Sequence, residues 1–351
     1  MDHRPRIWGL TLCFALTILS VTFFTPKPSS NRTLFVAPIS SIPSPPTTES
    51  QADTIPVLAY YYIWFDHESW DRAKKDYPLL GRYSSDSAYV MRQHIRWAKA
   101  AGIDGFIVSW KSTEKLNRRL GRLVRIADQE NFKLAIIYES LDFERKPLPV
   151  EQVNADLHYF INRYAQQPVF NLFEKPMVIW SGTWKFSLEE IQSVVKNKRE
   201  DILILASEKN VKDYQRLAKL VDGDAYYWSS VNPGQHSGYA EKLIAMGEAV
   251  HDNAGIWVAP AAPGYDSRML GGTTVVDRKD GETLRTQIEG TVQSTPDAIG
   301  LISWNEFSEN THLEPSKNYG YHYLKLLTEL VSQLSLLNDL DSSTPKTRLR
   351  R

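Results

Sequence analysis

Eight short apolar runs recur from residue 55 onward, and each is followed by a longer amphipathic stretch. The runs cover residues 56–62, 103–108, 133–138, 177–180, 202–205, 225–228, 256–259 and 298–302. Short, nearly continuous apolar runs are typical of parallel strands that helices bury on both faces. Because eight strand–helix repeats can close into a barrel, we expect an α/β fold, specifically a (β/α)8 TIM barrel. The alternative is an open, doubly wound sheet, which requires a topological switch point and usually has fewer strands.

The stretches between the runs have helical spacing and carry helix-capping residues. The predicted helices cover residues 86–101, 113–131, 150–165, 188–198, 211–220, 239–253, 281–294 and 319–337. Ser187 precedes one of them, and a serine oxygen can accept a hydrogen bond from the free N–H groups of a first helical turn. Gly102 follows the first predicted helix as a C-terminal stop.

The first 54 residues differ from the rest in composition. Residues 7–24 contain no charge and follow Arg4 and Arg6, which favours a membrane segment with its N-terminus on the cytoplasmic side. We interpret residues 1–24 as a signal anchor rather than a cleaved signal peptide, because no small-residue cleavage pattern follows. Residues 25–54 are rich in Pro, Ser and Thr and are expected to form a disordered linker.

These boundaries leave a (β/α)8 domain over residues 55–338, which is long enough for an enzyme, and a disordered basic tail over residues 339–351. The domain is expected to be membrane-anchored or secreted and to lie outside the cytoplasm, at the cell surface, in the periplasm or in a secretory lumen. Lysine plus arginine equals aspartate plus glutamate at 41 each, which argues against a nucleic-acid partner. No GxGxxG or Walker loop is present, and the histidines show no metal-ligand spacing, so neither a cofactor nor a metal is expected.

The carboxyl ends of the predicted strands carry acids and aromatic residues. A TIM barrel builds its active site at these ends, so we expect them to converge. Residues 300–315 are the richest such stretch, with Glu306, Glu309 and Glu314 directly after an apolar run. Paired carboxyls and aromatic rings are typical of a sugar-cleaving site, where one carboxyl protonates the leaving oxygen. The ordinary alternative is that these acids cap a helix or are solvated.

The ordered set of motifs resembles glycoside hydrolase family 99, the endo-acting α-mannosidases and their bacterial relatives. The resemblance covers about residues 58–335. Its pieces are residues 61–64 (YYIW), 78–85 (PLLGRYSS), His94, 101–110 (AGIDGFIVSW), Glu139, 222–226 (DGDAY), 262–265 (APGY) and 303–314 (SWNEFSENTHLE).

The resemblance implies a catalytic pair, Glu306 and Glu309, and no metal or cofactor. By position, Glu306 is the base that deprotonates the sugar 2-hydroxyl to give a 1,2-anhydro sugar, and Glu309 is the acid/base. A proton donor near neutral pH needs desolvation or a neighbouring carboxylate, and Glu309 beside Glu306 can have both. The sequence leaves open the ordinary alternative, a carboxylate nucleophile about 5–5.5 Å from the acid.

The expected partner is an oligosaccharide or polysaccharide. The resemblance and the strand ends together nominate the substrate-binding residues Tyr62, Trp64, Tyr83, His94, Trp110, Glu139, Trp228, Tyr265 and Asn305. The sequence departs from the family at Phe307, Ser308 and Asn310, where the family has Trp, His and Gly, which leaves the sugar specificity open. The alternative function is a non-catalytic carbohydrate-binding or polysaccharide-assembly protein on the same barrel, but both acids are present, which favours an enzyme.

Overall fold

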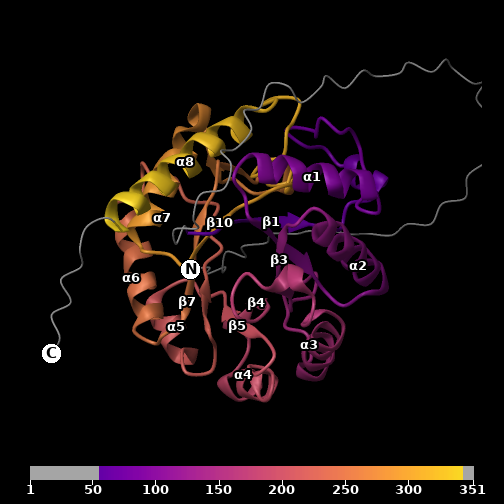
Figure 1. Ribbon diagram of the computed structural model, residues 1–351, viewed down its shortest axis with the longest axis vertical. Helices are drawn as coiled ribbons and strands as arrows, with labels where there is room; N and C mark the ends of the chain where they lie inside the picture. Colours follow the sequence, from indigo (N-terminus) through magenta and orange to yellow (C-terminus); the bar gives the residue numbers. More distant parts are fainter. Residues whose placement is uncertain (1–54, 343–351) are drawn as a thin grey trace, which may run out of the picture.

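Eight parallel strands pair edge to edge into a closed barrel in the computed structural model, which describes residues 55–342 (Figure 1). Their order around the barrel is β1-β10-β7-β6-β5-β4-β3-β2. The barrel strands are β1 (Val57–Tyr62), β2 (Gly105–Trp110), β3 (Lys133–Glu139), β4 (Met177–Ser181), β5 (Leu203–Ala206), β6 (Gly223–Ala225), β7 (Ile256–Ala261) and β10 (Ala298–Leu301). The predicted TIM barrel is confirmed. A separate antiparallel pair, β8 (Tyr265–Asp266) and β9 (Val275–Val276), follows β7.

Helices surround the strands on the outside of the barrel (Figure 1). They are α1 (Ala88–Ala100), α2 (Glu114–Gln129), α3 (Val150–Tyr164), α4 (Leu188–Val195), α5 (Val211–Leu217), α6 (Tyr239–His251), α7 (Glu282–Gln293) and α8 (His322–Ser342). Short 3₁₀ turns lie at His67–Trp70, Pro168–Phe170, Thr183–Lys185, Arg268–Leu270 and Lys279–Gly281. The predicted cap is present, because the Ser187 hydroxyl accepts the backbone N–H of Glu190.

The first and last barrel strands close the sheet. Val57 pairs with Ile299, and Ala59 pairs with Leu301. Because β1 and β10 lie at opposite ends of the chain, this pairing brings the segment after β10 to the same end of the barrel as the segment after β1. Figure 1 shows the two strands side by side.

The sixth strand differs from the prediction. The aromatic run 225–228 predicted a strand there, but β6 spans Gly223–Ala225 and ends before the aromatic residues. Gly223 has φ +153°, and a Cβ atom at this position would lie 2.0 Å from the backbone oxygen of Ile256. Only glycine fits such a close backbone approach. The strand begins at this glycine, two residues before the apolar run.

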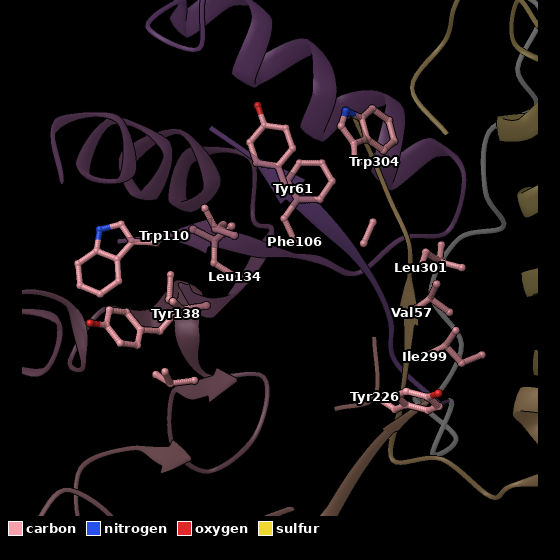
Figure 2. Packing of buried hydrophobic residues seen from close by; sticks show 14 of the residues in the cluster. Val57, Tyr61, Phe106, Trp110, Leu134, Tyr138, Tyr226, Ile299, Leu301 and Trp304 are labelled. Atoms are coloured by element: carbon pink, nitrogen blue, oxygen red, sulfur yellow. The ribbon is translucent and has the colours of Figure 1, made fainter. Parts of the chain in front are cut away.

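Side chains alternate between the barrel interior and the layer between strands and helices. On β1, Leu58, Tyr60 and Tyr62 belong to one core cluster, while the intervening residues belong to the other. Figure 2 shows the outer layer, which contains Tyr61, Phe106, Trp110, Tyr138 and Trp304. Alternation with period two therefore decides which residue at each strand end can reach the site.

This alternation corrects our prediction for Trp110. We predicted that it contacts substrate, but its side chain is fully buried in the outer layer, and its indole N–H donates to Asn117 on α2 at 2.9 Å. It lies against Tyr138 (Figure 2) and also against Phe160. Trp110 is therefore a core residue.

The predicted N-terminal segments lie outside the described residues. These are the anchor or signal peptide over residues 1–24 and the linker over residues 25–54; residues 343–351 of the predicted tail also lie outside. Helix α8 continues to Ser342, past the predicted domain end at 338. Within residues 55–342, no helix combines the length and apolarity needed to cross a membrane.

Replacing Trp110 with alanine should destabilise the fold, because it removes a fully buried indole from the outer layer. We expect a loss of about 3–5 kcal/mol in the free energy of unfolding, measured by urea denaturation. The control is Tyr89→Ala on α1, where the side chain is 61% exposed and the expected change is within about 0.5 kcal/mol. Equal losses in the two variants would contradict the assignment of Trp110 to the core.

Candidate active site

The segment after β10 folds back on itself and carries both predicted catalytic acids. The backbone N–H of Ser303 donates to the Thr311 carbonyl at 2.9 Å, and the N–H of Leu313 donates to the Ser303 carbonyl at 2.9 Å. Inside this loop, the Ser303 hydroxyl accepts the backbone N–H of Glu306 at 2.8 Å. We call residues 303–314 the acid loop. Its internal hydrogen bonds fix the backbone from which Glu306 and Glu309 project.

Asn305 attaches the acid loop to the end of β1. Its side-chain oxygen accepts the backbone N–H of Tyr62 at 2.8 Å, and its side-chain nitrogen donates to the Tyr62 carbonyl at 2.9 Å. The backbone N–H of Trp304 adds a bond to the Tyr60 carbonyl at 2.8 Å. These bonds extend the β1–β10 pairing beyond the last strand residue. Asn305 is fully buried, so the prediction that it binds substrate is wrong; its amide is used in holding the loop.

Arg278 holds the other side of the acid loop, and sequence reasoning missed it. Its Nη2 donates to the Asn310 carbonyl at 2.9 Å and to the His312 carbonyl at 2.8 Å. The guanidinium is buried against the rings of Tyr319 and Tyr323, 4.4 and 4.6 Å from their centres. The Glu309 carbonyl itself accepts the backbone N–H of Asp266 at 2.8 Å. Glu309 is thus fixed by hydrogen bonds to its own backbone and to the next residue.

Glu306 has the more polar surroundings of the two acids. Its side chain is 7% exposed, and Oε1 accepts the backbone N–H of Ser308 at 2.8 Å. Burial raises the pKa of Glu306, while the Ser308 hydrogen bonds and the charge of Lys74 oppose this rise. Lys74 is itself held in place by donating to the Ser69 carbonyl at 2.8 Å. These contacts stabilise the ionised form of Glu306.

Glu309 has few groups that stabilise its charge. Burial and then the charge of Glu306 raise its pKa to about 8, and Arg145 opposes this rise. In the part of the chain that the structure describes, no side-chain or backbone donor hydrogen-bonds to its carboxyl group. A carboxyl with this pKa is mostly protonated at pH 7, so Glu309 can donate a proton there.

Three phenols surround the acid pair. The hydroxyls of Tyr62 and Tyr227 are 2.7 Å apart, and burial followed by the charges of Glu309 and Glu306 raises the pKa of Tyr62. Burial and the same two acids raise the pKa of Tyr265 to about 12. The 41% exposed ring of Trp64 lies 4.4 Å from that of Tyr62. The structure therefore brings the predicted residues Tyr62, Trp64 and Tyr265 together with the acids.

Glu139 reaches the same end of the barrel from β3. Its Oε1 accepts the hydroxyl of Ser109, the last inward-facing residue of β2, at 2.9 Å. Burial raises the pKa of Glu139. Its charge also contributes to the raised pKa of Tyr62, after burial and the effects of Glu309 and Glu306. Glu139 therefore lies at the same end of the barrel as Glu306 and Glu309, and all three charges act on Tyr62.

Two other predicted substrate contacts lie behind the site. His94 on α1 is fully buried, with Nε2 3.0 Å from a Glu314 oxygen and Nδ1 3.0 Å from the Tyr61 hydroxyl. The Tyr83 hydroxyl donates to the other Glu314 oxygen at 2.8 Å. The prediction that His94 contacts substrate is wrong, and the Tyr83 hydroxyl is likewise occupied. Both side chains fix Glu314, the last residue of the acid loop.

Trp228 packs beside α6 and does not point into the barrel. Tyr227 instead occupies the inward position that we had predicted for Trp228. Tyr226 stacks on the Trp228 ring with 5.2 Å between ring centres, and the Lys242 amine lies 4.3 Å from that ring. Ala225 and Tyr227 belong to the barrel interior, while Tyr226 belongs to the outer layer. The alternation of side chains continues from β6 into the residues after it, and this signal could have selected Tyr227 from the sequence.

Within residues 55–342, no cluster of three or more His, Cys, Asp or Glu side chains is arranged to hold a metal ion. His312, which follows the acids, instead pairs with Asp76 at 3.2 Å and stacks on Phe307 at 4.0 Å between ring centres. A (β/α)8 barrel that presents two carboxyls of unlike environment among aromatic rings has the site of a glycoside hydrolase.

Comparison with known proteins gives the same class. The model of the family "Glycosyl hydrolase family 99" matches residues 61–329. A glycoprotein endo-alpha-1,2-mannosidase from Rattus norvegicus is 20% identical over 77% of this chain and 71% of its own length. A glycoprotein endo-alpha-1,2-mannosidase-like protein from Mus musculus is 21% identical over 70% of this chain, which spans only 58% of that relative.

A solved structure shows the same fold. The GH99 endo-alpha-mannosidase from Bacteroides thetaiotaomicron superposes with a TM-score of 0.70 at 18% identity, covering 83% of this chain and 100% of that one. Because the family model matches more than half of the sequence, the chain belongs to glycosyl hydrolase family 99. It is a glycoside hydrolase, as the sequence predicted.

Replacing Glu306 with glutamine should lower the pKa of Glu309, because the Glu306 charge is one of the two causes that raise it. The measurement is the carboxyl ¹³C shift of Glu309 followed by NMR from pH 5 to pH 10. The matched control, Glu68→Gln, removes an exposed carboxyl from the loop after β1 and should leave the Glu309 titration near 8. A Glu309 pKa that does not respond to Glu306→Gln would show that the two acids do not interact.

Proposed function

We propose that this protein is a retaining, endo-acting glycoside hydrolase that cleaves α-linked, α-mannoside-like glycans, with Glu306 as base and Glu309 as acid/base. The observation that carries the proposal is the unequal environment of the two acids. Glu306 accepts a hydrogen bond from Ser308, and the charge of Lys74 stabilises its ionised form. Glu309 is half-buried, and desolvation together with the charge of Glu306 raises its pKa to about 8. The names of the relatives support the α-mannoside substrate class and endo action.

In the proposed first step, Glu306 accepts the proton of the sugar 2-hydroxyl. The 2-oxygen attacks C1 to form a 1,2-anhydro sugar, the C1–O bond to the leaving group breaks, and Glu309 gives its proton to the departing oxygen. In the second step, Glu309 takes a proton from water, the water oxygen attacks C1 and opens the three-membered ring, and Glu306 returns its proton to the 2-oxygen. Two inversions at C1 give overall retention.

The surrounding residues suit a pyranose ring. Trp64 offers an exposed indole face supported by Tyr62, and aromatic faces bind the apolar faces of sugars. Glu139, held by Ser109, can accept hydrogen bonds from sugar hydroxyls. Tyr62, Tyr227 and Tyr265 keep their protons over the working pH range, because burial and the two acids raise the pKa of each phenol, so they serve as neutral donors.

Glu306→Gln and Glu309→Gln should each lower kcat by about 10²–10⁴-fold, the contribution typical of a positioned acid or base. The assay is hydrolysis of α-mannan oligosaccharides by the purified enzyme, with the anomer of the product followed by NMR. Glu68→Gln is the control and should keep full activity. Full activity in either active-site variant would remove that acid from the mechanism. Sugar binding without turnover in the wild type would favour the non-catalytic, carbohydrate-binding alternative.

The anhydro route predicts a strict need for the 2-hydroxyl. An α-mannoside substrate that lacks it should not be cleaved, because no other oxygen on the sugar reaches C1 in a three-membered ring. With a carboxylate nucleophile, the same substrate would still form a glycosyl-enzyme, detectable as a mass increase of the intact protein. Observing that adduct would replace the anhydro step with the nucleophilic one.

We also propose that residues 7–24 tether the enzyme to a membrane with the barrel outside the cytoplasm. The uncharged segment and the preceding arginines support this proposal. Expressed with this segment, the protein should pellet with membranes and resist extraction at high pH, whereas a chain starting at residue 52 should remain in the supernatant. Equal partitioning of the two forms would contradict a membrane tether.

A further inference from the structure

The loop after β3 presents a cation at the catalytic end of the barrel. This loop, residues 140–148, begins directly after Glu139 and forms a tight hairpin closed by a bridge between Leu141 and Pro147. The backbone N–H of Leu148 donates to the Ser140 carbonyl at 2.8 Å. We call it the β3 hairpin. Its closure at Glu139 fixes its tip relative to the sugar-binding acid.

The tip of the β3 hairpin is rigid. Asp142 Oδ1 accepts the backbone N–H groups of Glu144 at 2.9 Å and Lys146 at 2.8 Å, and the Asp142 N–H donates to the Lys146 carbonyl at 2.9 Å. Arg145 lies at the turn with φ +63°. Because the backbone is already ordered, a ligand that binds there need not order it.

Arg145 has no ion-pair partner of its own in residues 55–342. The neighbouring charges are already used, since Asp142 bonds the backbone and Glu144 pairs with Lys146 at 2.5 Å. The side chain of Arg145 is exposed. A guanidinium presents a planar set of donors that matches carboxylate and phosphate oxygens.

The β3 hairpin also carries an aromatic ring and contacts a second cation. Lys111, the residue after β2, donates from Nζ to the Leu141 carbonyl at 2.7 Å and lies 5.9 Å from the ring of Phe143. Phe143 is 71% exposed. An exposed ring on a hairpin that also carries Arg145 and contacts Lys111 is a surface that suits a sugar carrying a negative charge.

The charge of Arg145 is unfavourable for protonated Glu309 in a site that acts on a neutral glycan. Burial and Glu306 raise the pKa of Glu309, and the Arg145 guanidinium opposes that rise; it also opposes the burial-driven rise in the pKa of Glu139. A free cation beside a general acid weakens its hold on the proton. An anion bound to Arg145 would cancel this effect.

We propose that the β3 hairpin forms a subsite for an acidic substituent, a phosphate or a carboxylate, on the glycan substrate, with Arg145 as its main ligand and Lys111 and Phe143 beside it. The inference rests on the proposed glycan-cleaving function of the same site and names the class of glycan it takes. The acidic substituent both anchors the substrate and removes the unfavourable charge next to Glu309.

Binding of monosaccharide probes tests the subsite without turnover. The purified full chain, in a detergent without a sugar headgroup, is titrated calorimetrically at pH 7 with methyl α-D-mannoside, mannose 6-phosphate and mannuronic acid. At least one acidic sugar should bind about 10-fold or more tightly than the neutral one, as a charge-assisted hydrogen bond allows. Whichever acidic sugar binds more tightly identifies the substituent as phosphate or carboxylate. The preference should shrink in 0.5 M NaCl because salt screens exposed charges.

Arg145→Gln should reduce this preference to about 2-fold or less, whereas Arg125→Gln, which removes an exposed arginine on α2, should leave it intact. A preference that is absent in the wild type, or that survives Arg145→Gln, overturns the subsite. Hydrolysis is measured separately, on α-mannan oligosaccharides with and without the acidic substituent. If neither substrate is cleaved while the acidic preference in binding depends on Arg145, the proposed function is refuted and the subsite stands.

Discussion

The hydrogen bonds between Asn305 and the backbone of Tyr62 are the interaction on which the site depends. The pairing of β1 with β10 closes the barrel, and the Asn305 amide continues that closure into the acid loop. Because its side chain both accepts from and donates to the backbone of Tyr62, and also donates to the Tyr83 hydroxyl at 3.3 Å, the amide fixes the register of the loop on β1. Arg278 then holds the far side of the loop through two carbonyls. The buried amide of Asn305 and the buried guanidinium of Arg278 thus extend the strand pairing and fix the positions of the two carboxyls.

In the proposed mechanism, two identical side chains take different roles because their surroundings differ. Glu306 receives a backbone N–H and lies near a cation, so its ionised form is stabilised. Glu309 is attached to the same loop but receives no comparable donor, and the charge of Glu306 adds to the effect of burial. Each acid therefore depends on the other, since an ionised Glu306 is part of what keeps Glu309 protonated.

The sequence predicted the barrel and the acid pair but assigned several supporting residues incorrectly. Strand number and order were visible because apolar runs are a strong signal, and Glu306 and Glu309 stood directly after the last run. Side-chain direction was not visible from composition, so Trp110 and Trp228 were chosen where alternation places Ser109 and Tyr227 toward the interior. His94 and Asn305 were recognised as special, but only the folded contacts show that they act through Glu314 and Tyr62. Arg145 and Arg278 come from loops, where no periodic pattern reports what a side chain will meet.

The central claim, that one acid carries a proton at neutral pH while its neighbour does not, can be observed directly. Joint neutron and X-ray diffraction from a deuterium-exchanged crystal of the enzyme at pH 7 locates exchangeable hydrogens on carboxyl oxygens. We predict nuclear density for deuterium on a Glu309 oxygen and none on Glu306, whose Oε1 should instead accept the deuterium of the Ser308 amide. Deuterium on Glu306 with a bare Glu309, or two bare carboxylates, would contradict the account.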